Sequence, residues 1–129
     1  MDADEYRLNL NSITERIIGC VYKVSNTLGS SFLEKVYENA LALELRKNEL
    51  EVKQQYGIQV RYDTMVVGEF AADLLVEDRV FIELKATKAL DDIHMAQCLN
   101  YLKTTDLSLC LLVNFGKPKA EIRRFLNNY

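Results

Sequence analysis

Apolar residues in the first part of the chain follow a helical period. Between residues 12 and 28, and again between 31 and 47, they recur every three or four positions, so each segment is expected to form an amphipathic helix. Gly29 is a suitable stop for the first helix. The expected apolar face of the second helix comprises Phe32, Leu33, Val36, Tyr37, Ala40, Leu41 and Leu45.

Both helices have a candidate start signal in the sequence. Ser12 with Glu15, and Ser31 with Glu34, have the S-x-x-E spacing of a capping box, in which each side chain bonds a free backbone N–H of the first turn. We therefore expect the two helices to begin near these serines.

From residue 52 onwards the pattern changes to short apolar or alternating runs, which are typical of strands. One further helical segment interrupts them, with Asp91 and Asp92 at its start, where carboxylates are favoured. The expected elements are strands at 52–62, 66–76 and 79–86, a helix at 90–104, and strands at 107–115 and 120–126. The order ααβββαββ predicts a single α+β or mixed α/β domain over residues 1–129, in which the third helix could connect parallel neighbours.

The second and third expected strands form a hairpin whose register follows from its apolar pattern. A three-residue loop at 77–79 sets Leu74 opposite Ile82 and Asp73 opposite Glu83, whereas a two-residue loop would split the apolar face. Since side chains alternate across a strand, one face is expected to hold Ala72, Leu74, Val76, Val80, Ile82 and Leu84, and the other Ala71, Asp73, Leu75, Phe81, Glu83 and Lys85.

Two carboxylates directly across a ladder repel each other unless a positive charge compensates. Mg²⁺ suits such a pair, because it binds through one or two carboxylates and keeps several waters. Lys85, two residues after Glu83, can hold an attacking water or a phosphate oxygen. The same residues also fit a solvated outer face with a Lys–Glu pair, so spacing alone leaves both interpretations open.

Composition limits the classes of protein that fit. The 129 residues are 49% hydrophobic and 27% charged, which is typical of a globular domain with a real core. The apolar runs are too short for a membrane helix and the acidic N-terminus is unlike a secretory signal, so we expect a cytoplasmic protein without membrane contact. Cys20, Cys98 and Cys110 are expected to be buried thiols. The net charge of −3 offers no general attraction to nucleic acid, so such binding needs a local basic patch.

Asp73, followed after nine residues by Glu83-Leu84-Lys85, resembles the D…ExK signature of the PD-(D/E)XK nuclease superfamily. Between about Leu28 and Gly116, successive blocks resemble the bacterial GxxExxY family within it: "LGSSFLEKVYENAL", "VGEFAADLLVEDRVFIELKA", "AQCLNYLK" and "LLVNFG". The resemblance implies a restriction-endonuclease-like sandwich, a mixed β-sheet flanked by helices. It also implies hydrolysis of phosphodiester bonds in DNA or RNA with Mg²⁺ or Mn²⁺ as cofactor.

The resemblance assigns roles to the hairpin residues. Asp73 and Glu83 correspond to the metal-binding acids, and the backbone carbonyl of Leu84 to a further ligand. Lys85 corresponds to the catalytic lysine, which would orient the water and offset developing charge.

It also assigns roles outside the hairpin. Glu34 corresponds to the glutamate of the family motif and is implied to complete the metal shell or accept a proton. Tyr37 corresponds to the motif tyrosine, whereas Ser31 stands where the motif has glycine. Gln97 and Tyr101 match a QxxxY pattern and are implied to position the phosphate or the lysine.

Each of these residues also has a purely structural interpretation. Glu34 completes a capping box, Tyr37 fits the core, and Gln97 and Tyr101 share a helix face by their spacing. His94, one turn before Gln97, is expected to be idle, and Cys98 is expected in the core.

Two other functions fit the same sequence. A catalytically silent nucleic-acid-binding or protein-interaction module on this fold is favoured by the negative net charge, because a nuclease usually needs a cationic track. A small-molecule phosphoesterase is the third. Nucleic acid is the expected partner, and the sequence allows a homo-oligomer without specifying one.

Overall fold

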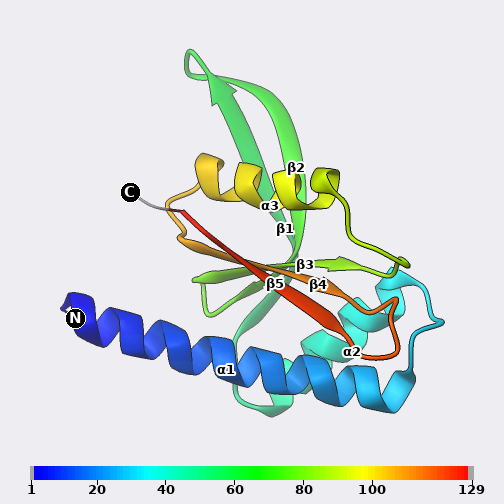
Figure 1. Cartoon of the computed structure of the whole chain (residues 1–129). Helices are drawn as coiled ribbons and strands as arrows, with labels where there is room; N and C mark the ends of the chain where they lie inside the picture. Colours follow the sequence, from blue (N-terminus) through cyan, green and yellow to red (C-terminus); the bar gives the residue numbers. More distant parts are fainter. Residues whose placement is uncertain (1, 128–129) are drawn as a thin grey trace.

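A computed structural model describes residues 2–127. Its elements follow the expected order, and each strand lies within two residues of its expected bounds (Figure 1). They are α1 (Ala3–Leu28), α2 (Glu34–Lys47), β1 (Val52–Tyr62), β2 (Met65–Val76), β3 (Val80–Lys85), α3 (Asp92–Thr104), β4 (Leu109–Asn114) and β5 (Glu121–Leu126).

The five strands form one mixed sheet in the order β1-β2-β3-β4-β5. β3 and β4 are parallel and are joined by α3, while the other neighbours are antiparallel. The helix between the third and fourth strands is therefore a crossover, as the sequence allowed. α3 covers one face of the sheet, and α1 and α2 cover the other (Figure 1). This arrangement is the predicted sandwich of a mixed sheet flanked by helices.

A separate core lies on each face of the sheet. The larger core joins α1 and α2 to alternate residues of the central strands, among them Leu74, Ile82 and Leu111. The smaller core joins α3 to Phe81, Leu112 and their neighbours, and Cys98 is buried there as expected. Among the described residues no helix combines the length and the apolar character needed to span a membrane.

The start of α1 differs from its expected position. The helix begins at Ala3, where the Asp2 side chain accepts a bond of 2.8 Å from the Glu5 backbone N–H. Ser12 therefore lies within the helix, and the predicted capping box with Glu15 is wrong. The reason is that residues 2–9 are exposed and Leu10 is the first buried residue. The first turns of α1 therefore have no buried apolar face that the sequence pattern could show. Gly29 ends the helix as predicted.

The start of α2 also differs, because Tyr37 binds the segment that precedes the helix. The Tyr37 hydroxyl donates to the Gly29 carbonyl at 2.6 Å and accepts from the Phe32 N–H at 3.2 Å, while its ring stacks on Phe115. The helix begins at Glu34 after Leu33, with no side-chain cap. The predicted capping box of Ser31 and Glu34 is therefore wrong. So is part of the predicted apolar face, since three of its members are exposed: Phe32, Leu33 and Val36.

The β2–β3 hairpin has the predicted register. Leu74 pairs with Ile82 and Val76 with Val80 across a three-residue turn at 77–79. Glu77 and Asp78 take positive φ angles there, as a tight hairpin turn requires.

The predicted alternation fails on the N-terminal side of Leu74 in β2. Ala72 belongs to the core under α3 together with Leu75, although Leu74 faces α1 and α2. The side-chain phase therefore changes around Asp73. Gln55 of β1, which would stand opposite Asp73, is missing from the β1–β2 pairing and has a φ of 52°. Such a local irregularity twists and bends the strands.

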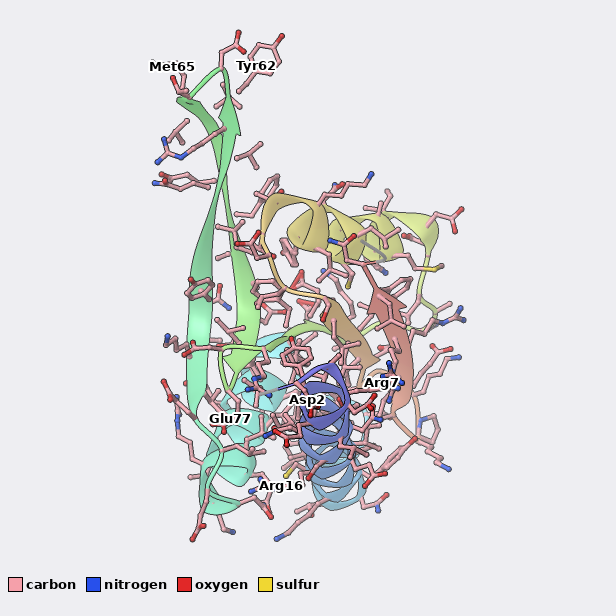
Figure 2. The ribbon with its side chains drawn as sticks, turned by 90° about the vertical axis from the view of Figure 1, so that its left-hand side faces the viewer. Asp2, Arg7, Arg16, Tyr62, Met65 and Glu77 are labelled. Carbon is pink, nitrogen blue, oxygen red and sulfur yellow. The ribbon has the colours of Figure 1, made fainter. Side chains whose placement is uncertain are left out.

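Beyond this irregularity β1 and β2 continue as a two-stranded arm. Figure 2 shows Tyr62 and Met65 at its tip, away from the body of the protein, and Glu77 at the opposite end of β2. Tyr62 is 71% exposed and Met65 is 68% exposed. Only its base is covered, by α3.

Candidate active site at the open end of the β2–β3 hairpin

The regular pairing of β2 with β3 ends at Leu74 and Ile82, and the Asp73 side chain replaces the next backbone pair. Asp73 Oδ2 accepts a bond of 2.7 Å from the Leu84 backbone N–H. The Lys85 carbonyl accepts from Phe115 N at 2.8 Å, on the β4 side. Because successive peptide groups point to opposite sides of a strand, the Leu84 carbonyl points to the β2 side, toward Asp73.

Glu83 lies beside Asp73 and is almost fully buried, with 2% of its surface exposed. Its Oε2 accepts a bond of 2.7 Å from the Tyr101 hydroxyl. Burial, together with the hydrogen bonding and charge of Asp73, raises the pKa of Glu83 to about 9, against the opposing influence of Tyr101 and Lys85. Near neutral pH and without a cation, Glu83 is therefore protonated, because burial disfavours its charged form most and the neighbouring Asp73 adds to this effect.

Lys85 and α3 complete this side of the site. Lys85 is half-buried and its charge acts on Glu83. Gln97 Nε2 donates to the Tyr101 hydroxyl at 2.9 Å, which links α3 to Glu83. Burial and the neighbouring Glu83 raise the pKa of Tyr101, so the phenol remains a hydrogen-bond donor. Gln97 and Tyr101, both named from the sequence, thus lie at the carboxyl pair, where Gln97 bonds Tyr101, and Tyr101 bonds Glu83 and the Ala71 carbonyl.

A second chain of polar contacts reaches Asp73 from α2, and sequence reasoning missed it. Gln55 Nε2 donates to Asp73 Oδ1 at 3.1 Å and to Glu38 Oε1 at 2.7 Å. Glu38 is 3% exposed and also bonds Gln54 and Lys35. The positive φ of Gln55 turns its amide toward both acids, and backbone strain of this kind is found at functional sites.

Glu34, in contrast, is exposed at the first turn of α2, and no hydrogen bond of its side chain joins it to the carboxyl pair. One turn later, Glu38 occupies the side of the helix that buries Ala42 and Leu45. The signal that could have found it was therefore a carboxylate within an apolar stripe. Gln55 had no comparable signal, because its role depends on contacts between three elements.

His94 has a structural role. Asp91 is the N-cap of α3, and the His94 side chain accepts from the Asp91 backbone N–H at 3.3 Å. This capping box accounts for the histidine without a part in the site.

The segment that follows Lys85 is fixed by a buried asparagine. The Asn114 amide donates to the Thr87 carbonyl at 2.9 Å and accepts from the Thr87 N–H at 3.1 Å and the Gly116 N–H at 2.9 Å. Asn114 is also the β4 residue paired with Lys85. The end of β3 is therefore held in place from β4.

The donor set suits a hard divalent cation. Among residues 2–127 no three His, Cys, Asp or Glu side chains gather closely enough to bind a metal by themselves. Asp73, Glu83 and the Leu84 carbonyl instead offer oxygen donors of the kind that Mg²⁺ and Mn²⁺ accept, with water completing the coordination. A cation bound there would replace the proton that Glu83 carries beside Asp73 in the metal-free protein.

A family model for the PD-(D/E)XK nuclease superfamily matches residues 11–125. The chain therefore belongs to this superfamily. The D…ExK signature of the sequence coincides with the carboxyl pair and lysine described above.

The fold is also similar to the crystal structure of an alkaline exonuclease from Laribacter hongkongensis, with a TM-score of 0.54 and 14% sequence identity. The similarity covers 73% of this chain and 56% of the exonuclease chain, so this protein spans little more than half of that one. No curated protein matches the chain at the sequence level. The family model thus shows the superfamily, and the likeness to the exonuclease shows the fold.

Proposed function

We propose that the protein is a metal-dependent nuclease that hydrolyses phosphodiester bonds of DNA or RNA at Asp73, Glu83 and Lys85. The observation that carries this proposal is the contact of two carboxyl groups beside the Leu84 backbone, within the superfamily's signature. A divalent ion bound there lowers the pKa of its water and offsets charge on the phosphate.

The side chains of the site divide the remaining tasks. Asp73 and Glu83 hold the ion, and Tyr101 with Gln97 fixes the orientation of the Glu83 carboxylate. Lys85 orients the attacking water and stabilises the negative charge that develops on the phosphate. Glu38, acting through Gln55, holds the Asp73 carboxylate in position.

Finer assignments belong to the same proposal. The sequence blocks favour the bacterial GxxExxY family within the superfamily, Mg²⁺ or Mn²⁺ as the ion, and a cytoplasmic location. For the acid on α2, Glu38 has direct support from its contacts, whereas the assignment of Glu34 rests on the family motif.

The test is cleavage of labelled single- and double-stranded DNA and RNA with Mg²⁺, Mn²⁺ or chelator. We expect cleavage only with a metal, and a loss of at least ~100-fold in Asp73→Asn, or about 2.7 kcal/mol of barrier. Lys85→Ala should lose as much cleavage yet keep Mn²⁺ binding, measured by calorimetry, because an ammonium is not a ligand. Lys88→Ala, an exposed lysine three residues on, is the matched control and should retain activity.

The same assay compares the two acids of α2. If Glu38 supports Asp73, Glu38→Gln should lower Mn²⁺ affinity by ~10–100-fold, as is usual for groups that orient metal ligands. A larger loss in Glu34→Gln than in Glu38→Gln would restore the assignment made from the motif.

Absence of cleavage with both metals would favour the alternative, a catalytically silent nucleic-acid-binding or protein-interaction module. The net charge of −3 is the observation on its side. In that case Asp73→Asn and the parent should bind nucleic acid equally well.

A further inference from the structure

A pocket of about 360 Å³ lies between β2 and α3, directly beside the carboxyl pair. One of its walls is Tyr101, whose hydroxyl donates to Glu83. A single tyrosine side chain therefore separates the pocket from the proposed metal ligands. The lining residues are Phe70, Ile93, Ala96, Gln97, Asn100 and Tyr101.

The lining is neutral and has two kinds of surface. Phe70 and Ile93 supply apolar surface, and they are 44% and 76% exposed. The Phe70 and Tyr101 rings meet edge to face, with centroids 6.3 Å apart, so Phe70 packs against the wall that Tyr101 forms. Gln97 and Asn100 supply amides, which both donate and accept hydrogen bonds. No charged side chain lines the pocket.

We infer that this pocket binds a nucleobase of the substrate strand, with Phe70 as the stacking surface and Asn100 as a polar contact to the base edge. This inference rests on the proposed function and specifies its substrate. A base is planar, uncharged and bordered by donors and acceptors, which matches an aromatic wall with amides beside it. A phosphate does not match, because the lining offers no cation to pair with it.

The position of the pocket determines which form of nucleic acid can reach it. A base in a duplex is already stacked and paired, so it reaches such a pocket only from a single strand or an opened end. With a base against Phe70, the adjoining backbone passes Tyr101 toward Glu83 and Lys85. The pocket therefore makes the protein a nuclease of single-stranded or frayed ends, and accepts any base, because every base has an aromatic face.

The experiment measures binding of a fluorescent single-stranded DNA by anisotropy, with Ca²⁺ in place of Mg²⁺, and of a matched strand in which abasic sites replace the central bases. The parent should bind the normal strand at least ~10-fold more tightly, since base–aromatic stacking contributes about 1–3 kcal/mol per base. Phe70→Ala should remove this difference, and Phe70→Tyr, which keeps a ring, should retain it. Val67→Ala is the control, since Val67 lies on the same strand, is 63% exposed and does not line the pocket.

Equal binding of the two strands by the parent would overturn the inference, as would no binding at all. An equal loss in Val67→Ala and Phe70→Ala would overturn it too, because the arm surface in general would then be responsible. The proposed function fails separately, by the absence of metal-dependent cleavage. Cleavage without a difference between the normal and abasic strands would support the proposed function and contradict the base pocket. Tighter binding of the normal strand without cleavage would support the base pocket and contradict the proposed function.

Discussion

Glu83 is a carboxyl group that the fold buries next to a second carboxyl group. A buried acid is tolerated in its neutral form, and the Tyr101 hydroxyl satisfies one of its oxygens. Asp73 accepts hydrogen bonds from the Gln55 amide and the Leu84 N–H. Near neutral pH Glu83 carries a proton, and replacing that proton by a divalent cation would change both the charge and the stability of the site.

This proton makes stability depend on pH in the metal-free protein. The pKa of Glu83 is about 9 in the folded protein, against 4.5 for an ordinary glutamate. The folded state therefore binds more protons between these values, so the free energy of unfolding should fall as pH rises from about 4.5 to about 9. Glu83→Gln is neutral at every pH and should be more stable than the parent near pH ~8, with the difference shrinking toward pH ~5.

The measurement is urea unfolding in chelator across this range, with the exposed Glu15→Gln as control. Glu15→Gln should follow the parent. Parallel pH profiles for Glu83→Gln and the parent would mean that Glu83 titrates near its usual value.

At the scale of elements, the β2–β3 hairpin was predictable because its apolar pattern fits one register. The alternation selects the three-residue turn that sets Leu74 opposite Ile82, since a slip by one residue would have exposed an entire apolar face. β4 lies inside the sheet, between β3 and β5, because its run of consecutive apolar residues needs cover on both faces.

The errors lie where a sequence pattern competes with contacts that the pattern does not mark. Ser31 and Glu34 have the spacing of a cap, but the Tyr37 hydroxyl bonds the Gly29 carbonyl and the Phe32 N–H, and the helix begins only at Glu34. Ala72 faces α3 because the phase of β2 changes at Asp73, opposite the strained Gln55. The first effect comes from a hydroxyl on the same helix, and the second needs a partner strand, so neither the spacing of Ser31 and Glu34 nor the alternation of β2 shows them.

The loop that follows β3 provides a test at this scale. A Cβ atom on Gly116 would lie 2.2 Å from the Thr87 carbonyl oxygen, and backbone cannot move aside as a side chain can. Gly116→Ala should therefore displace the segment after Lys85, lowering the free energy of unfolding by about 1–3 kcal/mol, the usual cost of overpacking. Gly19→Ala is the matched control, because Gly19 is exposed within α1 with nothing near its Cβ, and helix propensity predicts a gain of about 0.5–1 kcal/mol.

Urea unfolding of both variants measures these changes. Cleavage assays should show a loss in Gly116→Ala only. Unchanged stability in Gly116→Ala would mean that β4 and the loop are less firmly joined than the Asn114 contacts indicate.

At the scale of the whole molecule, the site lies where the buried central strands meet a less stable arm. Central strands β3 and β4 have a core on each face, so Glu83 and Lys85 are anchored in the most buried part of the protein. The outer halves of β1 and β2 form the two-stranded arm, with only its base against α3 (Figures 1 and 2). An isolated two-stranded ribbon is marginally stable in water. The proposed base pocket lies at the join, because Phe70 belongs to β2 and the other lining residues to α3.

Amide hydrogen exchange should distinguish the arm from the central strands. Amides at 59–62 and 65–68 should exchange through local opening, with protection well below that of β3 and β4, whose amides should require global unfolding. Because the pocket joins the arm to α3, single-stranded DNA with Ca²⁺ should raise protection around Phe70 and at the start of α3, and leave α1 unchanged. The abasic strand should not do so, and Phe70→Ala should show no increase with either strand. Uniform protection along β1 and β2 in the free protein would contradict an arm that opens independently. DNA-induced protection confined to α1 would place the nucleic acid on the opposite face of the sheet and contradict the base pocket.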